Sequence, residues 1–291
     1  MDKILEILQG KAFHLSKGIY NFLSTRYSNL TNKPIPDINI YPFHPEIIRQ
    51  IITYHREQFH TEEYIQSRIS NPTTGTIDHL HAEITAATAV ILGIKSGYKG
   101  YALELLRAAG HFHDSDRSFP KKMVGGEEKV RSNPEGYREY KKLHALNSVE
   151  RVKEIILKAD DNGYYSPSGF VKDLTYLILR HELGGEKLDG MNLLKQSKVD
   201  SSLNLNDLSD IVTDSDSLAY FDANILTNWE ECGKDKALLG KKVHFMYDRM
   251  TTDAQAELRA LIIFSDNHVL GSRSDDTDIN AIREVLLEIC N

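Results

Sequence analysis

Cysteine is scarce in this sequence, and long apolar runs are missing from it. The 291 residues include only two cysteines, Cys232 and Cys290, and neither belongs to a CxxC pair. Such usage does not build a disulfide framework, so we expect a reducing compartment. No run of about 18 apolar residues is present, so we expect no membrane-spanning helix. We also expect no secretory leader, which makes a cytoplasmic location the simplest prediction.

An excess of positive charge is lacking as well. Asp and Glu number 42 against 35 Lys and Arg, which gives a formal net charge of −7 at pH 7. This balance disfavours a broad nucleic-acid-binding surface but leaves room for a local basic pocket. We therefore expect a small-molecule partner rather than a membrane or a nucleic acid, and no pattern specifies an oligomeric state.

Alternating strand patterns, internal repeats and low-complexity tracts are absent, whereas apolar residues recur at helical spacing along most of the chain. A hydrophobic content of 41% with 26% charged residues is typical of a soluble globular protein with a sizeable core. We predict an all-α helical bundle that forms one globular unit. Its expected parts are an N-terminal helical extension or cap over 1–77, a core over 78–225 and C-terminal helices packed on the core over 226–291.

Several of the expected helices carry an imidazole or a carboxylate at or near an apolar face. His81, for example, shares its stripe with Ile84 and Leu92. Polar groups at apolar packing positions need a compensating partner, and a metal ion is the usual one. Helices are expected over 2–27, 45–58, 61–70, 78–93, 98–113, 137–159, 168–182, 207–221, 222–230, 234–250, 252–265 and 277–290. The candidate metal ligands are His81, His113, Asp114, His144, His181 and Asp216.

Two of these positions have close neighbours that could replace them as ligands. His79 precedes His81 by two residues and lies on a different helical stripe. Asp214 and Asp216 lie on nearly opposite faces of their expected helix. His144 also has an alternative to metal binding, because a histidine that begins an apolar helix can simply donate a hydrogen bond to a neighbouring carbonyl. Helical spacing alone leaves these alternatives open.

The order of the candidates resembles that of the HD superfamily of metal-dependent phosphohydrolases. That family presents a His, then a His-Asp pair, then a distant Asp on a helical bundle, and members with two further histidines in between hold two metals. The resemblance covers about 79–221 and favours His81 over His79 and Asp216 over Asp214. The segments that carry it are His81-Ala-Glu-Ile-Thr-Ala-Ala-Thr-Ala, Ala109-Gly-His-Phe-His-Asp-Ser-Asp-Arg, Arg180-His-Glu-Leu-Gly-Gly and Asp214-Ser-Asp-Ser-Leu-Ala-Tyr-Phe.

The resemblance implies a hydrolase that cleaves a phosphomonoester or phosphodiester of a nucleotide or small phosphorylated metabolite. Its nucleophile would be a water that bridges two divalent ions, with Asp114 as the natural bridging carboxylate. Imidazole and carboxylate ligands suit Fe, Mn, Co, Ni or Zn, and Mg is also compatible. Two alternatives are an HD-fold di-iron oxygenase that acts on a small polar substrate, and a non-catalytic metal-dependent ligand sensor.

Further charged residues are candidates for catalysis and substrate binding. Asp116 follows the His-Asp pair, and Glu182 beside His181 could orient a histidine ligand or a water. Lys242 and Arg249 are seven residues apart on one expected helix, where they could bind an anion or simply face solvent. A long polar loop is expected over 115–136, and it is either functional or simply solvated. It adds three candidate phosphate-binding residues: Arg117, Lys121 and Lys122.

Overall fold

The computed structural model describes residues 57–58, 61, 74–116, 134–159, 169–183, 195–264 and 277–289. The expected extension over 1–77, with its helices over 2–27, 45–58 and 61–70, therefore lies almost entirely outside the described residues. The same holds for Arg117, Lys121 and Lys122 in the expected loop.

The described residues are predominantly helical and contain no β-sheet, which confirms the predicted all-α class. None of the helices in this described part is long and apolar enough to cross a lipid bilayer. The elements are α5 (Thr74–Lys95), α6 (Tyr101–Phe112), α8 (Pro134–Ala159), α9 (Gly169–Leu183), α10 (Leu205–Ala219), the π-helical turn η4 (Tyr220–Asn224), α11 (Ile225–Glu231), α12 (Lys236–Asp248), α13 (Thr252–Phe264) and α14 (Thr277–Glu288).

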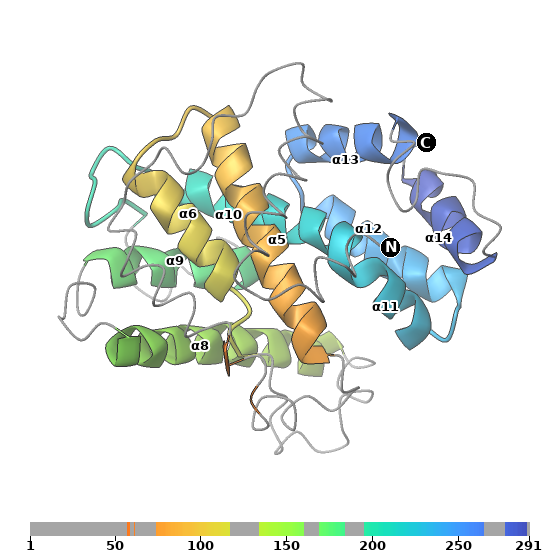
Figure 1. Cartoon of the computed structure of the whole chain (residues 1–291), viewed down its shortest axis with the longest axis horizontal. Coiled ribbons are helices and arrows are strands. Elements are labelled where there is room, and N and C mark those ends of the chain that lie inside the picture. The colour runs from red at the N-terminus through yellow and green to blue at the C-terminus, as the bar shows by residue number, and fades with distance from the viewer. Residues whose placement is uncertain are drawn as a thin grey trace.

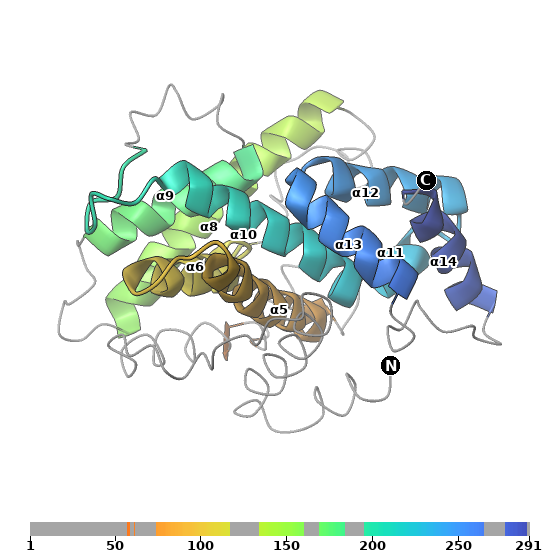
Figure 2. The same ribbon diagram turned by 90° about the horizontal axis from the view of Figure 1, so that it is seen from above.

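Helix α10 lies in the middle of the molecule and joins two groups of helices. On one side it packs on α5 and α9, which in turn contact α6 and α8 (Figure 1). On the other side it continues through η4 into α11, beyond which α12, α13 and α14 pack together. The view from above shows α5 and α6 side by side beneath α9 and α10 (Figure 2). A residue that faces inward from α10 can therefore meet residues from several helices.

The apolar core is built where these helices face one another. Leu105 and Leu106 on α6, Ile155 on α8, and Leu174 and Leu177 on α9 are all at most 1% exposed. Leu174 and Leu177 are three residues apart on α9, and buried Ala102, Leu105 and Ala109 follow one another at spacings of three and four on α6, which is the spacing of one helical face. The removal of this apolar surface from water is the main favourable contribution to the packing of the bundle.

Helices α5 and α6 approach unusually closely because Gly110 has no side chain. A Cβ atom placed on Gly110 would lie 2.5 Å from the Ala86 Cα atom and 2.7 Å from the Ala86 backbone nitrogen. Contacts of this length are sterically excluded, so only glycine permits the observed crossing. The crossing places the middle of α5, at Thr85 and Ala86, beside the end of α6, close to the candidate ligands His81 and His113.

Candidate metal centre

Four of the predicted ligands converge at one buried point. His81 comes from α5, His113 and Asp114 follow the end of α6, and Asp216 comes from α10. One ligand atom of each residue lies within 4.8 Å of the ligand atoms of the other three. All four residues are at most 7% exposed. The group brings together two imidazoles and two carboxylates, and it could hold a metal ion.

The contacts within this group are close. The Nε2 atom of His81 lies 3.0 Å from Asp216 Oδ1 and 3.2 Å from His113 Nε2. The His113 Nε2 atom lies 3.2 Å from Asp114 Oδ2 and 3.4 Å from Asp216 Oδ1. The donor atoms of three helices thus face a common centre.

His144 and His181 lie against the same group. His144, on α8, places its Nε2 atom 2.8 Å from Asp114 Oδ1. The His181 ring, on α9, packs edge-on against the His113 ring with 5.0 Å between the ring centroids. The structure therefore places His144 and His181 against the group of four that could hold an ion, and we call these six residues the metal cluster. Asp114 presents Oδ1 to His144 and Oδ2 to His113, so its two oxygens face different histidines.

Three of the four histidines are oriented by hydrogen bonds to the backbone. Nδ1 of His113 donates to the Gly110 carbonyl at 2.8 Å, and Nδ1 of His181 donates to the Ile178 carbonyl at 2.6 Å. Nδ1 of His144 donates to the Asp116 carbonyl. Because a carbonyl can only accept, each Nδ1 carries the proton and each Nε2 is the atom left for the metal cluster. Histidines that bind metals are commonly fixed in this way.

The cluster also contains buried nitrogen atoms without a hydrogen-bond partner among the described residues, namely His81 Nδ1 and His181 Nε2. A buried polar atom of this kind costs about 1–3 kcal/mol unless something satisfies it. His181 Nε2 lies 3.9 Å from the nearest Glu182 oxygen, too far for a hydrogen bond. A cation bound by Nε2 would satisfy His181, so the donor set and its geometry fit a divalent metal.

The neighbouring carboxylates determine which histidines of the metal cluster carry a second proton. Burial alone would lower the pKa of His113, but Asp114 and Asp216 outweigh it and raise the pKa to about 10. Burial and the neighbouring charge of His113 lower the pKa of His181 to about 4, so His181 is neutral. Burial would raise the pKa of Asp216, but Arg249 and the two histidines hold it well below its usual range. In the metal-free protein a proton on His113 thus offsets part of the negative charge.

The structure separates each candidate from its neighbour in the sequence. His79 Nε2 lies 3.4 Å from Glu83 Oε1, one helical turn along α5, and does not enter the group formed by His81. Asp214 accepts hydrogen bonds from the backbone N–H of Thr251 at 2.7 Å and from its hydroxyl at 2.6 Å. His81 and Asp216 therefore face the cluster, as the family pattern favoured.

Arg249 and Lys242 do not form the shared anion-binding face that their spacing suggested. Arg249 Nη1 lies 3.1 Å from Asp216 Oδ2, and its Nη2 donates to the His181 carbonyl at 2.9 Å. Lys242 instead contacts α11, where it donates to Asn228 and lies 3.4 Å from a Glu231 oxygen. Arg249 is thus a partner of the metal cluster, whereas Lys242 belongs to the packing of α12 on α11.

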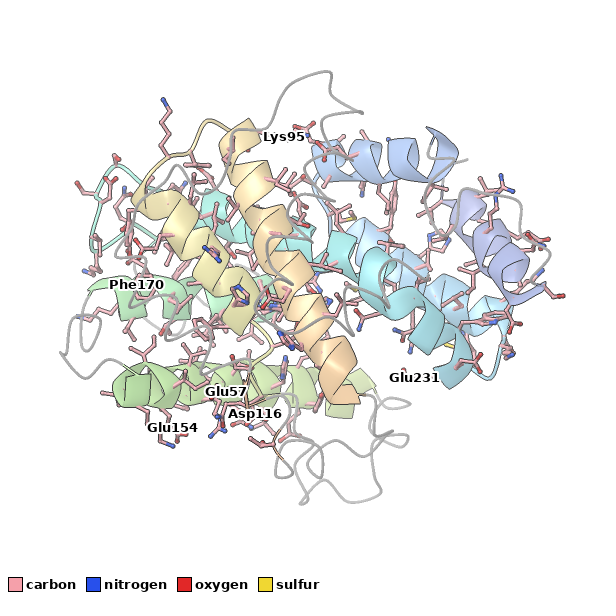
Figure 3. The ribbon with its side chains drawn as sticks, viewed as in Figure 1. Glu57, Lys95, Asp116, Glu154, Phe170 and Glu231 are labelled. Carbon is pink, nitrogen blue, oxygen red and sulfur yellow. The ribbon has the colours of Figure 1, made fainter. Side chains whose placement is uncertain are left out.

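Asp116 contributes through its backbone. Its carbonyl accepts from His144, and its backbone N–H donates to the Ser148 hydroxyl at 3.2 Å. Figure 3 shows Asp116 where the chain leaves α6, close to α8. Both bonds tie this turn to α8 and hold His144 in place.

Sequence reasoning missed Lys141, which lies beside the cluster. Its Nζ atom is 2.9 Å from Glu182 Oε1 and 4.6 Å from the centroid of the Phe245 ring. Burial would raise the pKa of Glu182, but Lys141 and Arg249 outweigh it and lower the pKa. Lys141 precedes His144 by three residues, so the two lie on neighbouring positions of one helical face. That spacing was the available signal.

No protein-family model, curated protein or solved structure matches the chain.

Proposed function

We propose that this protein is a metal-dependent phosphohydrolase of the HD type with a dinuclear centre. The observation that carries the proposal is the orientation of His113, His144 and His181. Each donates Nδ1 to a backbone carbonyl and keeps Nε2 for the buried cluster. One such bond is ordinary for a core histidine, but three histidines that leave Nε2 for the same buried cluster are typical of metal ligands.

The two carboxylate oxygens of Asp114 face different histidines, which supports two ions rather than one. His81, His113, Asp216 and Asp114 Oδ2 would hold one ion, because their donor atoms already lie together. His144, His181 and Asp114 Oδ1 would contribute to the second. The donor set contains imidazole and carboxylate but no thiolate, which suits Fe, Mn, Co, Ni or Zn and remains compatible with Mg.

Bound divalent ions in such a centre supply Lewis acidity, which makes water nucleophilic at neutral pH and polarises a phosphoryl oxygen. The residues of the chain supply the positioning. Arg249 fixes Asp216 and the end of α9 at once, through the Asp216 carboxylate and the His181 carbonyl. Glu182 lies next to His181, and its lowered pKa keeps it an ionised carboxylate that can accept a hydrogen bond from a water and orient it. The expected substrate is a phosphomonoester or phosphodiester of a small metabolite.

The test is metal analysis of anaerobically purified protein, followed by phosphate release from a panel of phosphate esters with Mn²⁺, Co²⁺ or Mg²⁺. We expect His113→Ala and Asp114→Asn to lose metal and to lose phosphate release by at least about a hundredfold. His79→Gln is the matched control, because His79 lies on the same helix as His81 but faces Glu83.

Two results would contradict the hydrolase proposal. One is the absence of phosphate release from every ester while metal stays bound, which would favour a ligand sensor. The other is oxygen consumption by an iron-loaded, mixed-valent form of the protein, which would favour an oxygenase. An unfolded control variant would be recognised by circular dichroism.

A further inference from the structure

The carboxylate of Asp216 divides its two oxygen atoms between the metal cluster and a cation. Its Oδ1 atom lies 3.0 Å from His81 Nε2 and 3.4 Å from His113 Nε2, within the group of four residues that could hold an ion. Its Oδ2 atom lies 3.1 Å from Arg249 Nη1. A carboxylate can bind a metal through one oxygen or through both. The contact with Arg249 therefore bears on how many oxygens Asp216 gives to the ion.

Arg249 is held in place independently of Asp216. Its Nη2 atom donates to the His181 carbonyl at 2.9 Å, which fixes the guanidinium to α9. Two residues later, Thr251 donates its backbone N–H and its hydroxyl to Asp214, which fixes the turn after α12 to α10. Because these attachments do not involve Asp216, the guanidinium is not free to follow Oδ2 towards the centre of the cluster.

The ion pair between Arg249 and Asp216 is shielded from water. The two side chains are only 16% and 9% exposed. A charge-assisted contact is stronger than one between neutral groups, and its loss would leave a guanidinium without its counter-ion where little water can replace it. Oδ2 therefore stays with Arg249 when an ion binds at Oδ1.

This division has a consequence for the number of open coordination positions. Four donor atoms lie together, one each from His81, His113, Asp114 and Asp216. An octahedral ion such as Mn²⁺ or Mg²⁺ takes about six ligands, so about two positions remain for water and for a substrate oxygen. A second oxygen from Asp216 would fill one of them. A centre that activates water and also polarises a phosphoryl oxygen needs both.

We propose that Arg249 is a positioning residue that restricts Asp216 to one metal-binding oxygen and so keeps a coordination position open for the substrate. This assignment rests on the proposed phosphohydrolase function, which it deepens by naming the residue that keeps the centre accessible. Arg249 lies outside the segment over 79–221 that resembles the HD family. The C-terminal helices thus contribute to the centre through a residue that the six-ligand pattern does not contain.

The test counts the waters on bound Mn²⁺ and uses no substrate. Coordinated waters exchange with the solvent, and the paramagnetic ion shortens the relaxation time of solvent protons in proportion to their number. Arg249→Met removes the cation and keeps much of the apolar bulk. At saturating Mn²⁺ we expect about one coordinated water fewer per chain than in the wild type, because Oδ2 turns to the ion. Arg249→Leu should behave alike, so either neutral variant that folds is sufficient.

A purely structural role of Arg249 predicts a different result. Asp216 would then leave the ion in the neutral variants and water would take its place, so the number of coordinated waters would stay the same or rise. Mn²⁺ affinity should fall modestly in both cases and does not distinguish them. Arg249→Lys keeps a cation beside Oδ2 and should retain the wild-type number of waters. Lys242→Met removes a cation of the same helix that contacts Asn228 instead, and it should change neither quantity.

Each outcome decides the assignment. The same or a larger number of waters in the neutral variants, or the complete loss of Mn²⁺ binding by them, would overturn it. A lysine variant that lacks the same water would also overturn it. A wild type that binds no Mn²⁺ would reject the metal centre together with the role of Arg249. Fewer waters in the neutral variants, without hydrolysis of any phosphate ester by the wild type, would uphold the role of Arg249 and reject the hydrolase.

Discussion

At the scale of single residues, His113 decides how the centre responds to pH. Asp114 and Asp216 raise its pKa to about 10, so Nε2 carries a proton in the metal-free protein at neutral pH. A metal binds only the deprotonated nitrogen and must displace that proton. His181, with a pKa of about 4, and Asp216, with a pKa well below its usual range, have no proton to release.

We therefore expect Mn²⁺ affinity to rise by up to about tenfold per pH unit between pH 6 and 8, with about one proton released for each ion bound at this position. The sign follows from the raised pKa, because the proton competes at every pH below it. Isothermal titration in two buffers of different ionisation enthalpy counts the protons directly. A dissociation constant that does not change over this pH range would contradict the assignment of His113 as a ligand.

Single residues also show what the sequence could predict about the site. The order of the histidines and aspartates was enough to name the six side chains that the structure brings together, and to favour His81 and Asp216 over their neighbours. The spacing of Lys141 from His144 placed Lys141 on the right face of its helix but could not name its partner Phe245, which lies 104 positions later in the sequence. The contacts of Lys242 with Asn228 and Glu231 were not predicted, because a shared helical face does not tell which neighbouring helix covers each end.

At the scale of elements, the crossing of α5 and α6 depends on Gly110. Gly110→Ala would push its Cβ against the Ala86 backbone, which cannot move without shifting the whole of α5. We expect a loss of about 1–3 kcal/mol in the free energy of unfolding and a weaker metal affinity, because His81 and His113 would move apart. Urea denaturation and Mn²⁺ titration measure the two effects.

Gly240 of α12 is the matched control for Gly110. It is also a buried helical glycine, but an added Cβ would meet only Val285 Cγ1 at an ordinary 3.9 Å. Gly240→Ala should leave metal affinity unchanged and raise stability by up to about 1 kcal/mol through helix propensity. Equal losses in both variants would show that the close crossing of α5 and α6 is not the cause.

A pair of contacts joins α10 to the turn between α12 and α13. Asp214 accepts two hydrogen bonds from Thr251, and Asp216 forms an ion pair with Arg249. Two residues of α10 that are two positions apart therefore contact two residues of the turn that are also two positions apart. Thr251→Val removes the hydroxyl bond and should cost about 1–2 kcal/mol, whereas Thr251→Ser should retain it. Thermal denaturation compares the two. Metal affinity should fall modestly in the valine variant only, because Arg249 is displaced from Asp216.

The helices themselves were easier to predict than the points where one helix passes into the next. Expected helices over 98–113, 168–182 and 207–221 agree with α6, α9 and α10 to within a few residues, since a strong apolar stripe marks each of them. The expected break after residue 221 is absent, because η4 carries the chain from α10 into α11 without a turn. A π-helical turn adds one residue to a helical repeat and leaves no composition signal, so periodicity interprets it as a helix end.

At the scale of the whole molecule, the metal cluster joins five helices that are far apart in the sequence: α5, α6, α8, α9 and α10. An ion bound there contacts the folded state only, so it should stabilise the entire bundle. At a free Mn²⁺ concentration of 100 times the dissociation constant, we expect a gain of about 2.7 kcal/mol. Differential scanning calorimetry with and without Mn²⁺ measures it.

His113→Ala is the control for this stabilisation. The variant should unfold at the same temperature with and without Mn²⁺, because the folded state no longer binds the ion more tightly than the unfolded chain does. The same rise in both proteins would mean that Mn²⁺ acts elsewhere on the surface. The comparison therefore tests the location of the ion as well as its effect.

The hydrogen bonds from His113 and His181 to Gly110 and Ile178 have a consequence for the order of binding. Both carbonyls lie near the C-terminal ends of α6 and α9, so two helices direct the negative ends of their dipoles towards the cluster. Together with the charges of Asp114 and Asp216, these ends repel an approaching phosphate as strongly as they attract a cation. In our proposal the metal must arrive first, and the substrate follows only after the sign of the local field has been reversed.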